Sequence, residues 1–114
     1  MIRLIEVTDI TEEMSKEFNL SDGDKLYGCY LDDTIIGYSV IRNNEADKVY
    51  LVILDEYQNQ GNGSKVFRTL LMLIDKRIEC VVPLDNYKMQ RIVLKNNGIE
   101  TGRDGENIHY VINK

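Results

Sequence analysis

The residues Val49–Ile74, VYLVILDEYQNQGNGSKVFRTLLMLI, decide how the rest of the chain is arranged. An apolar run that ends at Leu54 predicts a buried strand. A polar turn then leads to Gly61, Asn62 and Gly63. After the glycines, apolar residues recur every three or four positions: Val66, Phe67, Leu70, Leu71 and Ile74. This spacing predicts one apolar face of a helix, so the stretch reads as strand, glycine turn and amphipathic helix.

A glycine turn that opens a helix is suited to binding an anion. The first backbone N–H groups of a helix have no intrahelical partner, and the helix dipole adds partial positive charge there. Glycine has no Cβ, so a bulky anion can approach the backbone closely. Each charge-assisted hydrogen bond to a phosphate contributes roughly 1.5–3 kcal/mol. Lys65, in the first turn, would oppose the dipole alone but favours a bound anion.

Two common phosphate-binding loops do not fit this turn. A dinucleotide-binding loop has a third glycine three residues after the second, where this chain has Val66. A P-loop has its first glycine five residues before the second, where this chain has Gln58. What remains is the pattern Gln58-x-x-Gly61-x-Gly63 between a strand and a helix.

The rest of the chain predicts a mixed sheet of strands with helices on its faces. The spacing Asp9-Ile10-Thr11-Glu12 is that of a capping box, which predicts a short helix to about Phe18. Asp85 or Asn86 can cap a later helix to about Asn96, with Gly98 at its C-terminal end. The predicted strands are Ile2–Val7, Leu26–Leu31, Thr34–Arg42, Val49–Leu54, Ile78–Val82, Ile99–Gly102 and Ile108–Ile112.

Length and composition indicate one globular domain, residues 1–114. The net charge of −5 argues against nucleic acid as a partner, because binding the phosphate backbone needs a basic surface, and it favours a cationic substrate such as an amine. Cys29 and Cys80 lie in apolar runs, and no signal peptide is visible, so we expect reduced core cysteines and a cytoplasmic protein. No run is long enough for a membrane span, and one histidine without close ligand pairs predicts no metal site.

The pattern at Gln58, Gly61 and Gly63 resembles the acyl-CoA pyrophosphate loop of the GNAT N-acetyltransferase superfamily, Gln/Arg-x-x-Gly-x-Gly/Ala. The order of predicted elements over nearly the whole chain is also similar to that family. The resemblance implies a mixed α/β sheet with an antiparallel N-terminal meander, a parallel central pair and helices on both faces. One departure is the single helix between the first two strands, where the family usually has two, so the acceptor pocket would be open or completed by another subunit.

The resemblance implies transfer of an acetyl group from acetyl-CoA to an amine by direct attack in a ternary complex. Its coenzyme contacts fall on two segments of this chain. The strand segment would hold the pantetheine arm and the thioester: Leu51, Val52, Ile53 and Leu54. The loop and helix start would hold the pyrophosphate: Gln58, Asn59, Gln60, Gly61, Asn62, Gly63, Ser64 and Lys65.

The residues that would move protons are less well matched. Counting back from Gly98, the family's tyrosine acid falls on Leu94, which has no proton to give. Tyr87, Tyr110 or water are the remaining candidates for the acid. Asp47 falls near the family's carboxylate base at the start of the central strand, although a solvated turn residue is the favoured interpretation. His109 is expected on the surface, and Cys80 in the core.

A second hypothesis therefore stands beside the enzyme. The chain is then a catalytically weak or inactive GNAT-fold module that binds acyl-CoA, a protein partner or both. Leu94 and the shortened acceptor region favour this module, whereas the intact coenzyme loop favours the enzyme. A nucleotide-phosphate binder, a third class, is disfavoured by the two loop mismatches. The acetylated amine stays open between polyamine, antibiotic, amino acid and protein, and a homodimer is one option for the assembly.

Overall fold

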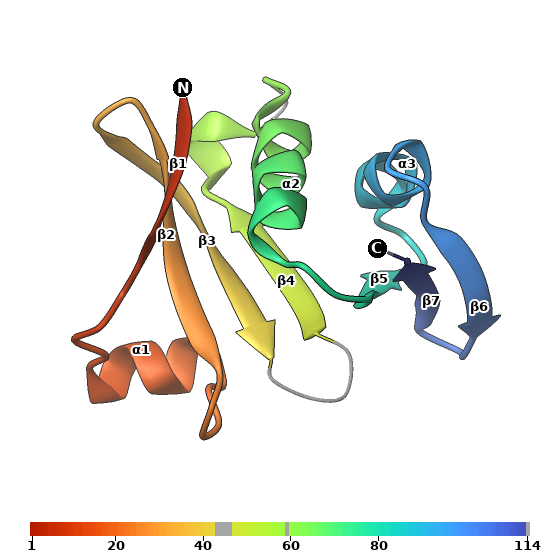
Figure 1. Ribbon diagram of the computed structural model, residues 1–114, viewed down its shortest axis with the longest axis horizontal. Coiled ribbons are helices and arrows are strands. Elements are labelled where there is room, and N and C mark those ends of the chain that lie inside the picture. Colours follow the sequence, from red (N-terminus) through yellow and green to blue (C-terminus); the bar gives the residue numbers. More distant parts are fainter. Residues whose placement is uncertain (43–46, 59, 114) are drawn as a thin grey trace.

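The computed structural model describes residues 1–42, 47–58 and 60–113, with 47–53 and 55 as backbone alone (Figure 1). The predicted alternation of apolar and polar residues becomes strands, and the amphipathic runs become helices. In chain order these are β1 (Ile2–Glu6), α1 (Glu12–Glu17), β2 (Lys25–Leu31), β3 (Thr34–Arg42), β4 (Asp47–Ile53), the 3-10 helix η1 (Asp55–Tyr57), α2 (Asn62–Leu73), β5 (Ile78–Pro83), α3 (Tyr87–Lys95), β6 (Ile99–Arg103) and β7 (Asn107–Ile112).

The described strands form one seven-stranded sheet in the order β1-β2-β3-β4-β5-β7-β6. Strands β1 to β4 are an antiparallel meander, as the sequence predicts, with an irregularity in the β2–β3 pairing between Cys29 and Tyr30. The crossover through α2 makes β4 and β5 parallel, because a helix between two strands returns the chain in the same direction. Strand β7 then inserts between β5 and β6, antiparallel to both.

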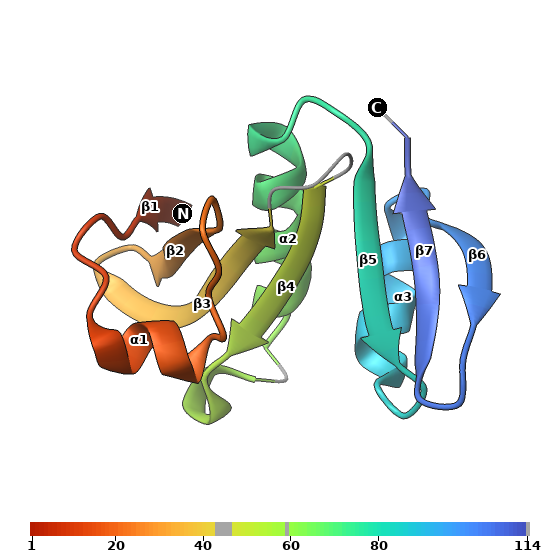
Figure 2. The ribbon, with the colours of Figure 1, turned by 90° about the horizontal axis from the view of Figure 1, so that it is seen from below.

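Helices cover both faces of this sheet. Helices α2 and α3 lie on one face, and α1 lies by the other face at the meander end (Figure 2). Val66, Phe67 and Leu70 of α2 are fully buried against the sheet, as their spacing predicts. Burial of an apolar side chain of this size contributes about 1.5–3 kcal/mol, so α2 is held mainly by this face. Cys29 and Cys80 belong to the same core as unpaired thiols.

The single helix before β2 is tied to the sheet at its C-terminal end. The Phe18 ring packs on Tyr38 with ring centroids 5.1 Å apart. Arg42 of β3 donates to the carbonyl oxygens of Phe18 and Asn19 at 3.2 and 3.0 Å, and to Asp24 Oδ2 at 2.6 Å. This ion pair is largely shielded from water, so it fixes the segment between α1 and β2 more firmly than an exposed pair would.

Two of the predicted helix caps need correction. Helix α1 is capped by Thr11, whose Oγ1 accepts from the Met14 backbone N–H at 3.2 Å, so the predicted capping box that starts at Asp9 is wrong by two residues. After α3 the residue with positive φ is Asn97, at 69°, rather than Gly98. The Gly98 N–H still closes the helix by donating to the Val93 carbonyl at 2.9 Å.

Candidate functional site

Strands β4 and β5 are hydrogen-bonded only where they begin. Their register covers three residue pairs, Asp47 with Ile78, Lys48 with Glu79 and Val49 with Cys80. Both strands continue beyond these pairs, to Ile53 and Pro83, and diverge (Figure 2). The predicted thioester-binding segment lies in the diverging part of β4. Leu51, Val52 and Ile53 pair there with β3, and the Leu54 N–H donates to the Ile36 carbonyl at 2.8 Å.

Helix α2 starts beside the same end of β4, because only η1 and a short loop separate them. Its N-cap is Gly61 in the left-handed conformation, with φ of 77°, and no side chain caps the first turn. The Lys65 N–H bonds to the Gly61 carbonyl at 3.3 Å. The N–H groups of Asn62, Gly63 and Ser64 precede that first helical bond. They are therefore the donors from which a bound anion would accept hydrogen bonds.

The loop before α2 is fixed by side-chain hydrogen bonds. Asn62 is only 3% exposed, and its Nδ2 donates to the Tyr57 carbonyl at 2.9 Å. Gln60 Nε2 donates to the Glu56 carbonyl at 3.1 Å. A Cβ at Gly61 would meet nothing within 4 Å, so glycine is required there by its backbone conformation and not by packing. Three of the predicted loop residues, Gln60, Gly61 and Asn62, thus act on the loop's shape.

The other predicted loop residues lie around this helix start. Gln58 and Lys65 are exposed, and Gly63 and Ser64 are partly buried. Asn59 lies outside the described residues. The structure therefore brings Gly61 to Lys65 together at the N-terminus of α2, next to the diverging end of β4.

The predicted catalytic residues lie on three separate elements. The Asp47 backbone opens β4 beside Ile78 of β5. Tyr87 is the first residue of α3 and is 68% exposed. Tyr110 of β7 is 3% exposed, and burial and the nearby Glu100 raise the pKa of its hydroxyl. Leu94, at the position of the family tyrosine, is 55% exposed on α3.

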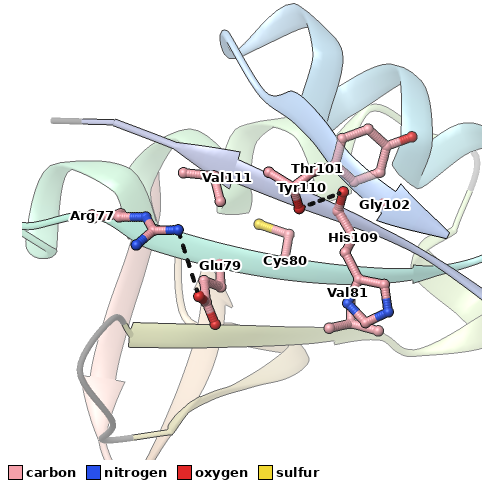
Figure 3. Close-up of a pocket in the computed structure, with 9 residues that line it drawn as sticks. All are labelled: Arg77, Glu79, Cys80, Val81, Thr101, Gly102, His109, Tyr110 and Val111. Atoms are coloured by element: carbon pink, nitrogen blue, oxygen red, sulfur yellow. Dashed lines mark hydrogen bonds and ion pairs between the residues drawn. The ribbon is translucent and has the colours of Figure 1, made fainter.

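The sequence interpretation missed a pocket of about 270 Å³ on the other face of β5, β6 and β7 (Figure 3). Glu79 and Val81 line it from β5, and His109 and Val111 from β7. The sequence predicts His109 at the surface but does not predict its partner. His109 Nε2 lies 3.0 Å from Asp104 Oδ2. The signal was present in the spacing, because Asp104 begins the turn into the strand in which His109 alternates with the buried Ile108 and Tyr110.

The pKa values of Asp104, beside the pocket, and of the two core cysteines are shifted for different reasons. The hydrogen bond from His109, followed by those from two backbone N–H groups, lowers the pKa of Asp104 to about 2. Burial raises the pKa of both Cys29 and Cys80 to about 12, so these thiols stay protonated and unreactive at neutral pH. Within the described residues no three potential metal ligands cluster. None of the described helices is long and apolar enough to cross a membrane.

Comparison with known proteins identifies the fold. No family model matches the sequence, and no curated protein matches it. The N-acetyltransferase PseH of Campylobacter jejuni, solved in complex with acetyl coenzyme A, is 13% identical and superposes with a TM-score of 0.81 over 100% of this chain and 99% of its own. An acetyltransferase from Thermus thermophilus is 15% identical and superposes with a TM-score of 0.78 over 100% of this chain and 97% of its own. A GNAT family acetyltransferase from Elizabethkingia anophelis, solved with acetyl-CoA bound, is 12% identical and superposes with a TM-score of 0.77 over 99% of this chain and 98% of its own. The chain therefore has the GNAT acetyltransferase fold, as the sequence resemblance predicts.

Proposed function

We propose that the protein is an N-acetyltransferase that moves the acetyl group of acetyl-CoA to an amine by direct attack in a ternary complex. One observation carries the proposal: the uncapped start of α2 and the diverging part of β4 meet at the same end of the sheet. An anion-binding helix terminus beside an open strand edge suits a ligand that has a pyrophosphate and a long amide-containing arm. Structures of the same fold that hold acetyl coenzyme A support this reading.

The chain's own groups have distinct parts in this reaction. The N–H groups of Asn62, Gly63 and Ser64 bind the pyrophosphate, and the exposed Lys65 adds positive charge beside them. Backbone groups from Leu51 to Leu54, at the end of β4 and just beyond it, bind the pantetheine arm, and one N–H stabilises the oxyanion formed on the thioester. These contacts use main chain, so they tolerate varied side chains.

Proton transfer completes the mechanism. An amine is mostly protonated in neutral water and must lose a proton before it attacks. Asp47 at the start of β4 is one base that fits the family pattern. Tyr87 is exposed on the first turn of α3, so its hydroxyl is accessible to a departing thiolate, whereas Tyr110 is enclosed in the core. Tyr87 or a water molecule is therefore the acid that we propose.

Thermal unfolding with and without acetyl-CoA tests the coenzyme site. A ligand at about 100 times its Kd adds roughly 2.7 kcal/mol, which raises the midpoint on the order of ten degrees in a domain of this size. We expect this shift with acetyl-CoA and none with ATP. The variant Gly61→Val should fold yet lose the shift, because a β-branched residue does not adopt the positive φ of the N-cap and projects a side chain toward the anion. An unchanged shift in Gly61→Val would show that the coenzyme binds elsewhere.

A binding module without catalysis is the second candidate function. The exposed Leu94 favours it, because the position that holds a tyrosine acid in many family members carries no ionisable group here. Release of the coenzyme A thiol in the presence of amines separates the two functions. Acetyl-CoA binding without thiol release from any amine tested would support the module.

A further inference from the structure

The pocket on the open face of β5 and β7 is accessible from solvent and lies opposite the helices. In β5, Ile78, Cys80 and Val82 are buried toward α2 and α3. The residues between them, Glu79 and Val81, face the other way and line the pocket. Figure 3 shows Glu79, Val81 and His109 extending to the same side of β5, away from Cys80. The pocket thus belongs to the face that α2 and α3 leave uncovered.

The position of the pocket along the strands relates it to the β4–β5 pairing. Glu79 is paired with Val111, and Val81 with His109. The last β4–β5 pair is at Cys80, between Glu79 and Val81. The pocket therefore sits where β4 and β5 begin to separate. A ligand in it and a ligand bound from the α2 start approach that separation from opposite faces of the sheet.

The pocket carries a carboxylate that is loosely engaged. Among the described residues, Glu79 Oε1 lies 3.8 Å from Arg77 Nη2, and the two side chains are 33% and 55% exposed. An ion pair this long and this exposed is worth little, at about 0–1 kcal/mol. A cationic ligand can replace it at small cost.

The imidazole of His109 is held far more firmly. Its Nε2 lies 3.0 Å from Asp104 Oδ2, and Asp104 Oδ1 accepts the Glu106 and Asn107 N–H groups at 2.8 Å each. A carboxylate fixed in this way favours the tautomer that carries its proton on Nε2. The lone pair is then on Nδ1, which makes His109 a proton acceptor with a set orientation.

We propose that this pocket receives the amine acceptor as its ammonium ion, with Glu79 as counter-ion and His109, oriented by Asp104, as the group that takes the ammonium proton. The proposal rests on the acetyl transfer proposed above and names its acceptor class, a small primary amine that is cationic in solution. Glu79 and His109 contact the acceptor, and Asp104 acts through His109.

The ammonium ion gives one proton to His109 Nδ1, and the free amine attacks the thioester carbonyl carbon. The C–N bond forms, and the C–S bond breaks with its electron pair on sulfur. Tyr87 or a water molecule protonates the thiolate, the second nitrogen proton, lost as the amide forms, restores that acid, and His109 returns its proton to water. One ammonium ion and one acetyl-CoA thus give one amide, one coenzyme A thiol and one proton.

Charged groups around His109 come from each neighbouring strand that the structure describes. Asp104 precedes it in its own hairpin, and Glu79 and Arg77 lie on β5. On β6, Arg103 is held by Glu100 through two hydrogen bonds of 2.8 and 2.9 Å. Glu79 and the loosely paired Arg77 line this pocket, and Asp104 adjoins it as the hydrogen-bond partner of the lining His109. The two carboxylates outnumber the one guanidinium among these groups, a balance that suits a cation better than an anion.

Steady-state kinetics test the counter-ion. The assay follows thiol release with butylamine, 1,4-diaminobutane and lysine as acceptors. Glu79→Gln should raise the KM of the best amine at least tenfold and leave the Kd of acetyl-CoA unchanged. The matched control is Glu106→Gln, which removes a carboxylate from the exposed β6–β7 turn outside the pocket and should leave both constants unchanged. Equal KM values in wild type and Glu79→Gln would refute the counter-ion.

The pH profile tests the proton acceptor. His109→Asn should lower kcat at least tenfold at neutral pH and remove the acidic limb of kcat/KM, so that activity recovers only at a pH where the amine is itself deprotonated. Asp104→Asn keeps the acceptor of the turn and should lower kcat less. If Asp47→Asn removes the limb and His109→Asn does not, His109 has no such role.

Failure of this assignment differs from failure of the proposed function. A wild-type protein that binds acetyl-CoA and releases thiol, with Glu79→Gln and His109→Asn indistinguishable from it, overturns the pocket alone. A wild-type protein that does not bind acetyl-CoA overturns both.

Discussion

Gly98 follows α3 at a point where the chain passes very close to the helix. A Cβ there would lie 2.4 Å from Val93 Cγ1 and 2.8 Å from the Val93 carbonyl oxygen. Gly98→Ala therefore forces a backbone shift at the buried Val93, and we expect it to reduce the free energy of unfolding by about 1–3 kcal/mol in urea denaturation. Gly105→Ala is the control, because a Cβ at Gly105 meets nothing within 4 Å. Equal stability of the two variants would contradict this explanation.

Asp104 predicts an acid dependence of stability. Its pKa is lowered from 3.8 to about 2 in the folded protein, first by the hydrogen bond from His109. A carboxyl whose folded pKa is depressed stabilises the fold above its unfolded pKa, and this contribution disappears as pH falls toward the folded value. The Tm of Asp104→Asn should consequently fall less steeply than that of wild type between pH 4 and 2. Parallel Tm curves for the two proteins would argue against the Asp104 interaction.

Individual site residues were predictable only where backbone rules apply. The sequence predicts Gly61 as a residue of the anion-binding turn, and the structure adds that it has a positive φ, at the point where the turn meets the helix. The Asp104–His109 contact joins a turn to a strand, and its recognition requires the hairpin register that the structure supplies. Tyr110 was a candidate acid by residue type, yet its strand register turns it into the core beside Glu100.

At the scale of elements, the N-cap of α3 gives a direct test. The sequence left Asp85 and Asn86 as alternatives, and the structure selects Asn86, whose Oδ1 accepts from the Met89 N–H at 3.2 Å. Replacement of an N-cap by alanine costs about 0.5–2 kcal/mol. We expect that loss for Asn86→Ala and a change within about 0.5 kcal/mol for the surface variant Asp85→Ala, measured by chemical denaturation. The reverse order would assign the cap to Asp85.

Existence and order of the elements were predictable because each has its own period and its own turn residues. Boundaries were less so. The cap of α1 moved from Asp9 to Thr11, since a hydroxyl and a carboxylate are both good caps and only the chain path decides between them. The central strand begins at Asp47, two residues earlier than the apolar run suggests, because its polar start pairs with β5.

For the molecule as a whole, the open edge of β4 predicts which backbone amides a bound ligand protects from hydrogen exchange. Amides of β4 beyond Val49 that do not bond to β3 have no β5 partner. Acetyl-CoA should slow hydrogen exchange at these amides and in the first turn of α2, and leave the β1–β2 pair unchanged. Hydrogen–deuterium exchange with mass spectrometry measures this. Protection spread evenly over the sheet would indicate general stabilisation and not a site.

The three β4–β5 pairs also bear on how the chain reaches its fold. Strands β1 to β4 contact their neighbours in sequence, so their contact order is low, and helix α2 follows directly. The parallel pair closes a loop that contains the whole of α2, and closing this loop costs chain entropy. The few hydrogen bonds of so short a pairing offset that cost only in part. We therefore expect the meander and α2 to form the folding nucleus, with β5, β6 and β7 docking afterwards. The β4–β5 edge, which is open to a ligand in the native state, is then also the last strand pairing to form during folding.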